Sequence, residues 1–183
     1  MPDRLAHRLA LAAVAMLAAG LARAGESYGL GQPATPREIA GWDIDVSPSG
    51  AGLPPGQGGV HEGEAIFAAK CAACHGPHGE GKPMDRLVGG VGTLRDKKPE
   101  KTVGSYWPYA TTLFDYVRRA MPLNAPQSLT PDEVYAVSAY VLFLNGIVAP
   151  DTTLDEGNLA KIKMPNRDGF VSAEPAPEAG AKP

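Results

Sequence analysis

The only two cysteines of the chain stand three residues apart, and a histidine follows the second one directly. They are Cys71, Cys74 and His75, in the pentapeptide CAACH. Thiols serve as nucleophiles, metal ligands or disulfide partners, and an imidazole serves as a metal ligand or an acid–base group. A disulfide here would close a very short loop, and the stabilisation expected from a cross-link falls as the loop shrinks. The pattern therefore points to binding or redox chemistry.

Two common uses of paired cysteines lack the sequence context that they require. A thioredoxin-like pair follows a strand in a βαβ unit, whereas a helical pattern leads into Cys71. A structural zinc site needs four ligands, and beyond the motif only His61 and His78 remain after residue 24. The pentapeptide instead matches the motif of c-type haem attachment. We therefore predict one covalent haem c, with both thiols bonded to one porphyrin edge and His75 presented to the iron.

A second axial ligand decides what the iron can do. A methionine thioether raises the reduction potential and closes the iron, whereas an open position permits O₂ or peroxide chemistry. Met121 ends a predicted helix and precedes Pro122, so its sulfur can reach the face opposite His75. Met84 lies too close to the motif to cross the macrocycle, and Met164 lies beyond the last predicted helix. A core position for Met121 is the alternative.

The remaining polar candidates are weaker. His61 and His78 are interpreted as surface residues, because His78 cannot readily reach the far face from three positions after the motif. Tyr106 and Trp107 are open to two interpretations, with their polar tips either on the haem propionates or in ordinary core packing. No set of acid, base and nucleophile accompanies the motif, so we expect an electron-transfer protein and not an enzyme. A haem enzyme or gas sensor with a displaceable ligand is the alternative class.

The N-terminus resembles a secretory signal peptide over residues 1–24. Arg4 and Arg8 precede an apolar run that ends in an A-x-A cleavage site, Ala22-Arg23-Ala24. An uncleaved anchor is the alternative, but a membrane span needs about 20 apolar residues. We therefore expect an exported, periplasmic chain with no membrane span after cleavage. The net charge of −3 argues against nucleic-acid binding, which depends on clustered Lys and Arg.

Apolar periodicity predicts three main helices, over residues 60–75, about 109–120 and 131–145. The third has the clearest start, because Thr130 and Glu133 form a capping box around Pro131. Gly63 and Phe67 on the first helix and Tyr140 on the third are expected to meet where the two helices cross. The Gly/Pro-rich segment 76–108 is expected to wrap a bound group that supplies part of its core.

Irregular extensions flank this haem domain, which is expected to span residues 60–148. Residues 25–59 form an N-terminal arm whose only helix signal is TPREIAGW, and its stretch PSGAGLPPGQGG, residues 48–59, is expected to be loop. A disordered tail is the alternative for this arm. Residues 149–171 form a C-terminal extension, and residues 172–183 are too polar and proline-rich to pack, which predicts a disordered tail. The predicted class is all-α.

The motifs CAACHG, AMP at residues 120–122, LTPDEV and YVLFLNG resemble those of class I cytochromes c, over about residues 58–147. That resemblance implies three main helices around one haem, with His75 and Met121 as axial ligands. A second resemblance covers nearly the whole mature chain, and it is to the cytochrome subunit of Sox-type sulfur dehydrogenases and of related periplasmic sulfite dehydrogenases. It rests on YGLGQPATPREIAGWDIDV, KTVGSYWPYATTLFDYVRRAMP, APQSLTPDEVYAVSAYVLFLNGIV and MPNRDGF.

The second resemblance implies a partner. Those cytochromes accept electrons from a molybdenum-cofactor (molybdopterin) catalytic subunit, and the electrons then pass to another cytochrome c or to an oxidase. The Sox subunit usually carries two haems, whereas this chain has one CxxCH motif and corresponds to one of its domains. A free, diffusible cytochrome shuttle is the alternative function.

The haem is expected to be part of the core. Burying several hundred Å² of porphyrin at about 25 cal/mol per Å² contributes on the order of 10 kcal/mol. That is comparable to the net stability of a whole domain. The double variant Cys71→Ala, Cys74→Ala is therefore expected to lack a cooperative unfolding transition, as followed by circular dichroism in urea. A cooperative melt of this haem-free chain would contradict the prediction.

Overall fold

A computed structural model describes residues 30–171 and residue 173 of the chain. The predicted signal peptide and nearly all of the predicted disordered tail lie outside these residues. The chain divides after Ile39 into two units, and the unit from Ala40 onward holds the main helices. Among the described residues, no helix is both long enough and apolar enough to cross a membrane.

The first described helix, α2 (Pro36–Trp42), has the N-terminus that the sequence predicts. The backbone N–H of Thr35 donates to Glu38 Oε2 at 2.8 Å, and the N–H of Glu38 donates back to Thr35 Oγ1 at 3.3 Å. These reciprocal bonds form a capping box. None of the residues of α2 is buried, so its own capping rather than core packing supports the helix.

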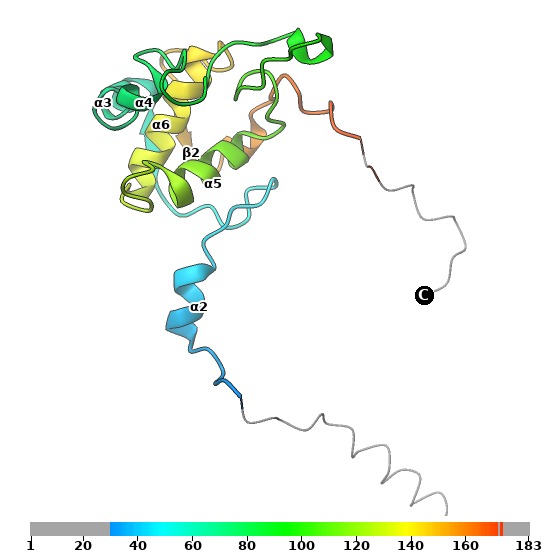
Figure 1. Ribbon diagram of the computed structural model, residues 1–183. Coiled ribbons are helices and arrows are strands. Elements are labelled where there is room, and N and C mark those ends of the chain that lie inside the picture. The colour runs from blue at the N-terminus through cyan, green and yellow to red at the C-terminus, as the bar shows by residue number, and fades with distance from the viewer. Residues whose placement is uncertain (1–29, 172, 174–183) are drawn as a thin grey trace, which may run out of the picture. The chain divides into compact units, whose positions relative to one another are not determined.

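The haem domain has the three predicted main helices, and the all-α class is confirmed. The elements are α3 (Val60–Lys70), the short α4 (Ala72–His75), η1 (Thr93–Arg95), α5 (Ala110–Ala120) and α6 (Pro131–Leu144). The predicted first helix is broken at Cys71, whose φ and ψ of −124° and −37° leave the helical region. Figure 1 shows α6 at the centre of the domain, where it packs against both α3 and α5.

Helix α6 forms the middle of the core. Its capping box is confirmed, with the Glu133 N–H donating to Thr130 Oγ1 at 3.3 Å and the Thr130 N–H donating to Glu133 Oε2 at 2.8 Å. The nine consecutive residues from Val134 to Leu142 are buried. A helix that is buried all round must contact other elements on every side. Gly146, at φ 67°, ends it in the left-handed conformation.

The crossing of α3 and α6 depends on a glycine. A Cβ atom built at Gly63 would overlap the carbonyl oxygen of Ala136, so only glycine permits this backbone approach. One turn further on, the rings of Phe67 and Tyr140 pack with their centroids 5.4 Å apart. The predicted meeting of these residues is confirmed.

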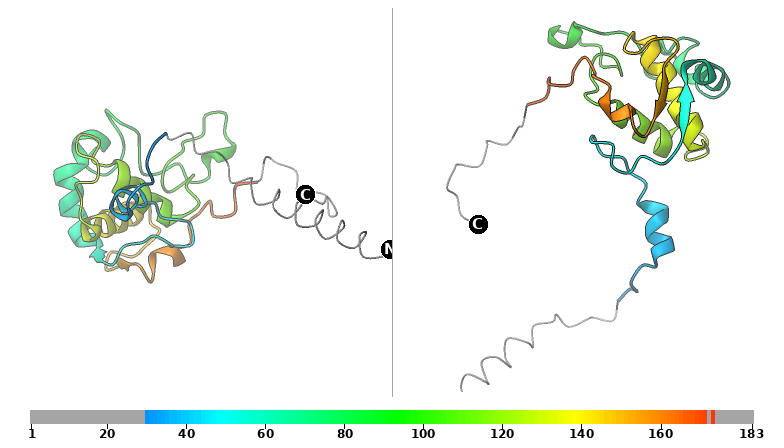
Figure 2. Two further views of the ribbon diagram at one scale, coloured as in Figure 1. Left: turned by 90° about the horizontal axis from the view of Figure 1, so that it is seen from below. Right: turned by 180° about the vertical axis from the view of Figure 1, so that it is seen from behind.

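A short antiparallel sheet joins the two ends of the domain. Strand β1 (Gln57–Gly59) precedes α3 and pairs with β2 (Thr153–Asp155) in the C-terminal extension (Figure 2). The prediction of loop for residues 48–59 is therefore wrong at residues 57–59. Their hydrogen-bonding partner lies far away in the sequence, so no local pattern could indicate the pairing.

Both flanking segments contribute to the core. On the N-terminal side, Val46 is buried, and its backbone N–H donates to Asp115 of α5 at 2.8 Å. Asp115 also pairs with Arg119 one turn later. On the C-terminal side, the buried residues are Leu154 of β2, Leu159 of η2 (Leu159–Lys161) and Met164.

Substitution of Gly63 tests the helix crossing. Gly63→Ala is expected to lower the free energy of unfolding by about 3 kcal/mol, because the added methyl group must push two backbones apart. Urea melts of the haem-loaded protein measure the change. Gly41→Ala is the control, since a Cβ built there meets nothing within 4 Å, and it is expected to change stability by no more than about 1 kcal/mol. A Gly63→Ala protein as stable as its parent would show that the crossing tolerates a side chain.

Candidate functional site

The attachment motif lies where α3 ends and α4 begins. The Cys71 N–H donates to Phe67 O at 2.8 Å and closes α3, and the Cys74 N–H donates to Cys71 O at 3.1 Å in the next turn. Cys71 is partly buried and Cys74 is exposed. Burial raises the pKa of the Cys71 thiol to about 11.

The ring of His75 is oriented by the backbone. Its Nδ1 lies 2.8 Å from the carbonyl oxygen of Asp85. Because that oxygen can only accept, Nδ1 carries the proton and the lone pair of Nε2 is left for a metal. A carbonyl that accepts from the second ring nitrogen in this way fixes the orientation of a metal-binding imidazole.

The turn after the motif folds back along it. The Gly81 N–H donates to His75 O at 2.7 Å, and the Met84 N–H donates to Cys74 O at 2.9 Å. Met84 therefore lies beside the attachment motif, where the sequence places it, and its side chain is 47% exposed. Asp85, the partner of His75, is the next residue.

Met121 is the first residue after α5, and its N–H donates to Val117 O at 3.1 Å. Its side chain is partly buried and packs against the core. Met164, in contrast, is 1% exposed and lies within the core cluster. Of the three methionines, Met121 alone combines partial burial with a position at the end of a main helix.

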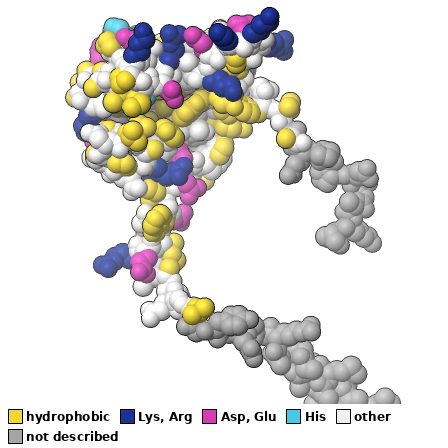
Figure 3. Space-filling view, in the orientation of Figure 1, with side chains coloured by type: hydrophobic (Ala, Val, Ile, Leu, Met, Phe, Trp, Pro, Cys, Tyr) yellow, Lys and Arg dark blue, Asp and Glu magenta, His cyan; other side chains and the backbone are white. Residues whose placement is uncertain are grey.

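Apolar side chains that are only partly covered surround the core cluster. They come from α3, α6, the attachment motif and the connecting segments, and they include Ile66, Cys71, Leu87, Trp107, Met121, Phe143, Leu144 and Ile147. Figure 3 shows hydrophobic side chains gathered across the middle of one face of the domain. A flat apolar group would remove this surface from water, and a porphyrin fits that description.

Tyr106 and Trp107 make contacts of ordinary packing. The Tyr106 ring lies edge-on to Phe170, with centroids 5.2 Å apart, and Lys101 Nζ lies 5.1 Å from its centroid. The Trp107 ring lies edge-on to Tyr116 at 5.8 Å. Neither arrangement requires a propionate, so the propionate role of these two residues stays a prediction.

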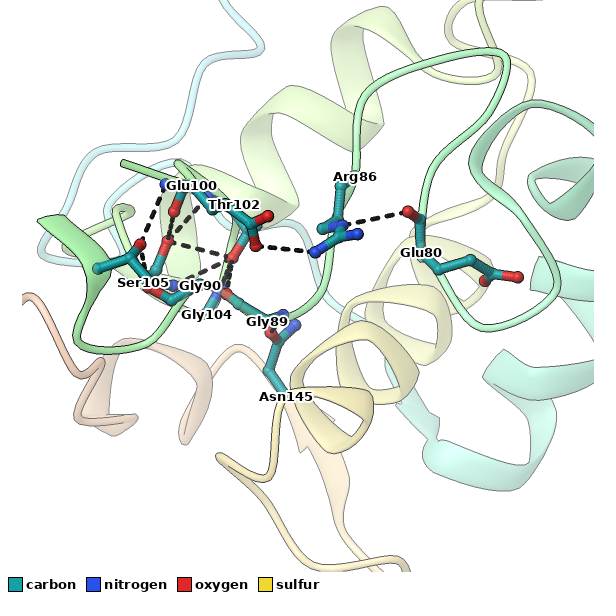
Figure 4. A network of polar contacts seen from close by, with 10 residues as sticks. Glu80, Arg86, Gly89, Gly90, Glu100, Thr102, Gly104, Ser105 and Asn145 are labelled. Atoms are coloured by element: carbon teal, nitrogen blue, oxygen red, sulfur yellow. Dashed lines mark hydrogen bonds and ion pairs between the residues drawn. The ribbon is translucent and has the colours of Figure 1, made fainter. Parts of the chain in front are cut away.

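A polar network that the sequence did not indicate holds the long segment between α4 and α5 (Figure 4). Asn145, just after α6, donates through Nδ2 to Leu87 O at 3.2 Å and accepts from the Gly89 N–H at 3.1 Å. A Cβ atom at Gly104 would overlap the Asn145 side chain. In the sequence, Asn145 is merely a polar residue before a helix-stopping glycine, and nothing there relates it to residues 87–89.

The same network continues along the segment. Thr102 Oγ1 donates to Gly89 O at 2.6 Å, and Ser105 Oγ donates to Glu100 O at 2.6 Å. Arg86 Nη1 pairs with Glu100 Oε2 at 2.8 Å. Side chains of the segment therefore satisfy much of its backbone themselves. That a bound group supplies part of its core stays a prediction.

An all-α domain with CxxCH between two helices, an oriented imidazole and a methionine after the next main helix defines the class I c-type cytochromes, which carry covalent haem c and transfer electrons. The cytochrome c family model matches residues 60–145. A chain in the crystal structure of the sulfane dehydrogenase SoxCD from Paracoccus pantotrophus is 42% identical, with a TM-score of 0.75. That match covers 86% of this chain and 84% of the other. The chain therefore belongs to the cytochrome c family.

A second relative is less similar in sequence. The thiosulfate dehydrogenase of Stutzerimonas stutzeri (strain A1501) is 30% identical over 116 residues. This match covers 61% of the chain but 36% of that protein, so the chain spans only about a third of that relative's length.

Removal of the Met121 thioether tests the second axial position. Met121→Ala is expected to abolish the long-wavelength charge-transfer band of ferric iron–methionine and to let the ferrous protein bind carbon monoxide at neutral pH. Met84→Ala removes a half-exposed methionine beside His75 and is expected to leave both properties unchanged. Loss of the band in Met84→Ala, or carbon monoxide binding by the parent protein, would overturn the assignment.

Proposed function

We propose that this chain is the haem subunit of a periplasmic sulfur-oxidising dehydrogenase. It accepts electrons one at a time from a molybdenum-cofactor catalytic subunit that oxidises sulfite or a sulfur compound, and it passes them to another cytochrome c or an oxidase. The observation that carries this proposal is the extent of the match to the SoxCD chain. That match covers 86% of the chain, whereas the cytochrome c family model matches only residues 60–145. The resemblance thus includes segments that a simple haem carrier does not need.

The residues of the site have separate tasks in this proposal. Cys71 and Cys74 hold the haem through thioether bonds, which prevents its loss from an exported protein. His75 Nε2 and the Met121 thioether would hold the iron. When bound, the haem supplies an iron that gains and loses one electron.

The protein limits rearrangement when the electron moves. The hydrogen bond of 2.8 Å from His75 Nδ1 to Asp85 O holds the imidazole in one orientation in both oxidation states. Partial burial of Met121 against the core keeps water from its side of the site. Tyr106 and Trp107 are proposed to approach the propionates, with the packing described above setting their positions.

The extensions supply a surface for the catalytic partner. Of the nine large apolar side chains exposed among the described residues, five lie outside the family match: Leu30, Ile39, Trp42, Phe170 and Val171. Ile39 and Trp42 are 51% and 88% exposed and stand three positions apart in α2, so they share one helix face. Exposed apolar residues in such an arrangement mark interaction sites, and tryptophan is a frequent anchor. This favours a partner-binding arm over a disordered tail.

Substitution of the two anchors tests the proposal. Ile39→Ala with Trp42→Ala is expected to weaken binding to the catalytic subunit by ~30-fold, about 2 kcal/mol, and to leave the haem spectrum unchanged. Co-purification from periplasmic extract measures the loss. Point substitutions are preferable to removal of the whole arm, because Val46 belongs to the core.

Val91→Ala is the matched control, since Val91 is a 62% exposed apolar residue outside the arm, and it is expected to leave co-purification unchanged. Full retention of the catalytic subunit by the double variant would refute the role of the arm. A native protein that elutes from periplasm as a monomer and reduces oxidases without a stable partner would favour the free shuttle instead.

A further inference from the structure

The N-terminal arm contains a short segment that lies along α5. Residues 44–54, here called the strap, fold back on themselves, with the Ser47 N–H donating to Ala51 O at 2.9 Å. A Cβ atom built at Gly52, where φ is 89°, would overlap the carbonyl oxygen of Asp45, so only glycine permits this turn. Figure 1 shows the strap, in cyan, beside α5. The strap therefore has a defined shape of its own.

Three polar side chains of α5 bind backbone groups of the strap. They are Thr111, Asp115 and Arg118, which stand four and three positions apart and so share one face of the helix. The Val46 N–H donates to Asp115 Oδ1 at 2.8 Å, and Arg118 Nη1 donates to Ile44 O at 3.0 Å. Thr111 and Asp115 are buried although both are polar. The strap therefore covers a face of α5 that would otherwise be open to water.

A second face of α5 packs against α6. The ring centroids of Phe114 on α5 and Tyr135 on α6 lie 4.5 Å apart. Tyr135 also donates through its hydroxyl group to Pro54 O at 2.9 Å, so α6 holds the far end of the strap. Helix α5 is therefore held from two sides, by the core helix and by the strap.

Met121 depends on α5 for its position. Its N–H donates to Val117 O at 3.1 Å in the last turn of the helix, and Arg118 stands three positions before it. The residues that follow give little support, because residues 123–128 are all exposed and the next buried residue is Leu129. Helix ends without tertiary contacts fray. Contacts that hold the last turns of α5 therefore also hold the Met121 side chain.

We propose that the strap is a positioning element for the second axial ligand, with Asp115 and Arg118 as the positioning residues. The inference rests on the proposed electron-transfer function, in which the Met121 thioether would hold the iron. The strap keeps the last turns of α5 formed, so that the thioether stays available to the iron in both oxidation states and other ligands are kept out. Asp115 and Arg118 act through the helix backbone. The arm thus serves the haem site as well as the partner.

Two substitutions of Asp115 separate its hydrogen bond from its charge. Asp115→Asn keeps an oxygen that can accept from the Val46 N–H, whereas Asp115→Ala removes it, and both remove the charge. In the haem-loaded ferric protein, Asp115→Ala is expected to weaken the iron–methionine charge-transfer band and to raise the affinity for added imidazole by ~10-fold, and Asp115→Asn to change it by less than about threefold. Equal effects of the two variants, or an intact band in Asp115→Ala, would overturn the proposal.

A substitution in the strap makes the same test without touching α5. Gly52→Ala distorts the strap, because its Cβ would overlap Asp45 O, and it is expected to weaken the same band and to raise imidazole affinity. Gly92→Ala is the matched control, because Gly92 also has a positive φ, of 85°, but a Cβ there meets nothing within 4 Å. It is expected to leave band and affinity unchanged. A lower urea midpoint with an intact band in Gly52→Ala would assign the strap to stability alone and contradict the proposal.

The coupling must act in both directions. Met121→Ala is therefore expected to speed hydrogen exchange of the Val46 N–H in the native, haem-loaded protein by ~10-fold. Exchange of the Val60 N–H, which donates to Thr152 O, is expected to change by less than about twofold. Unchanged exchange at Val46, or equal acceleration at both amides, would count against the strap.

These measurements separate the inference from the proposed function. An iron–methionine band that survives Met121→Ala would refute the ligand assignment itself. A band that is lost in Met121→Ala but intact in Asp115→Ala and Gly52→Ala would refute only the role of the strap. Weakened bands in the strap variants of a protein that has no catalytic partner in periplasmic extract would refute the proposed function and support the strap.

Discussion

The close crossing of α3 and α6 at Gly63 is the contact on which the site depends. Because no side chain separates α3 from the Ala136 backbone, the two helices approach closely and bring Phe67 against Tyr140. Helix α3 continues directly into Cys71 and α4, so the position of the motif follows from the crossing. The rigid support is α6, which is buried along nearly all of its length. Covalent attachment near this support gives the haem a fixed position relative to the core.

The residue after α6, Asn145, also positions the segment between α4 and α5. Asn145 accepts from one backbone group of the segment between α4 and α5 and donates to another, so the helix at the centre of the core also positions residues 87–89. The same segment supplies the Asp85 carbonyl that orients His75. A series of contacts therefore runs from the α3–α6 crossing, through Asn145 and the segment after α4, to the imidazole of His75.

Exposed large apolar side chains are distributed unevenly over the described part of the chain. Exposed apolar anchors are concentrated in the extensions, as expected for a lasting complex that removes them from water.

The sequence by itself determined the chemistry and the main helices. CAACH indicates the cofactor through the types and spacing of two cysteines and a histidine within five residues, and Thr130 with Glu133 marks a helix start through bonds between near neighbours. These signals are local, so they can be interpreted without knowledge of the fold. Only the tertiary structure decided the pairing of β1 with β2, the Asp85 partner of His75 and the binding of residues 87–89 by Asn145. Each of these contacts uses at least one backbone group, which every residue carries alike. The residue types at that position therefore give no sign of the contact, which forms only when the packing of the helices brings the groups together.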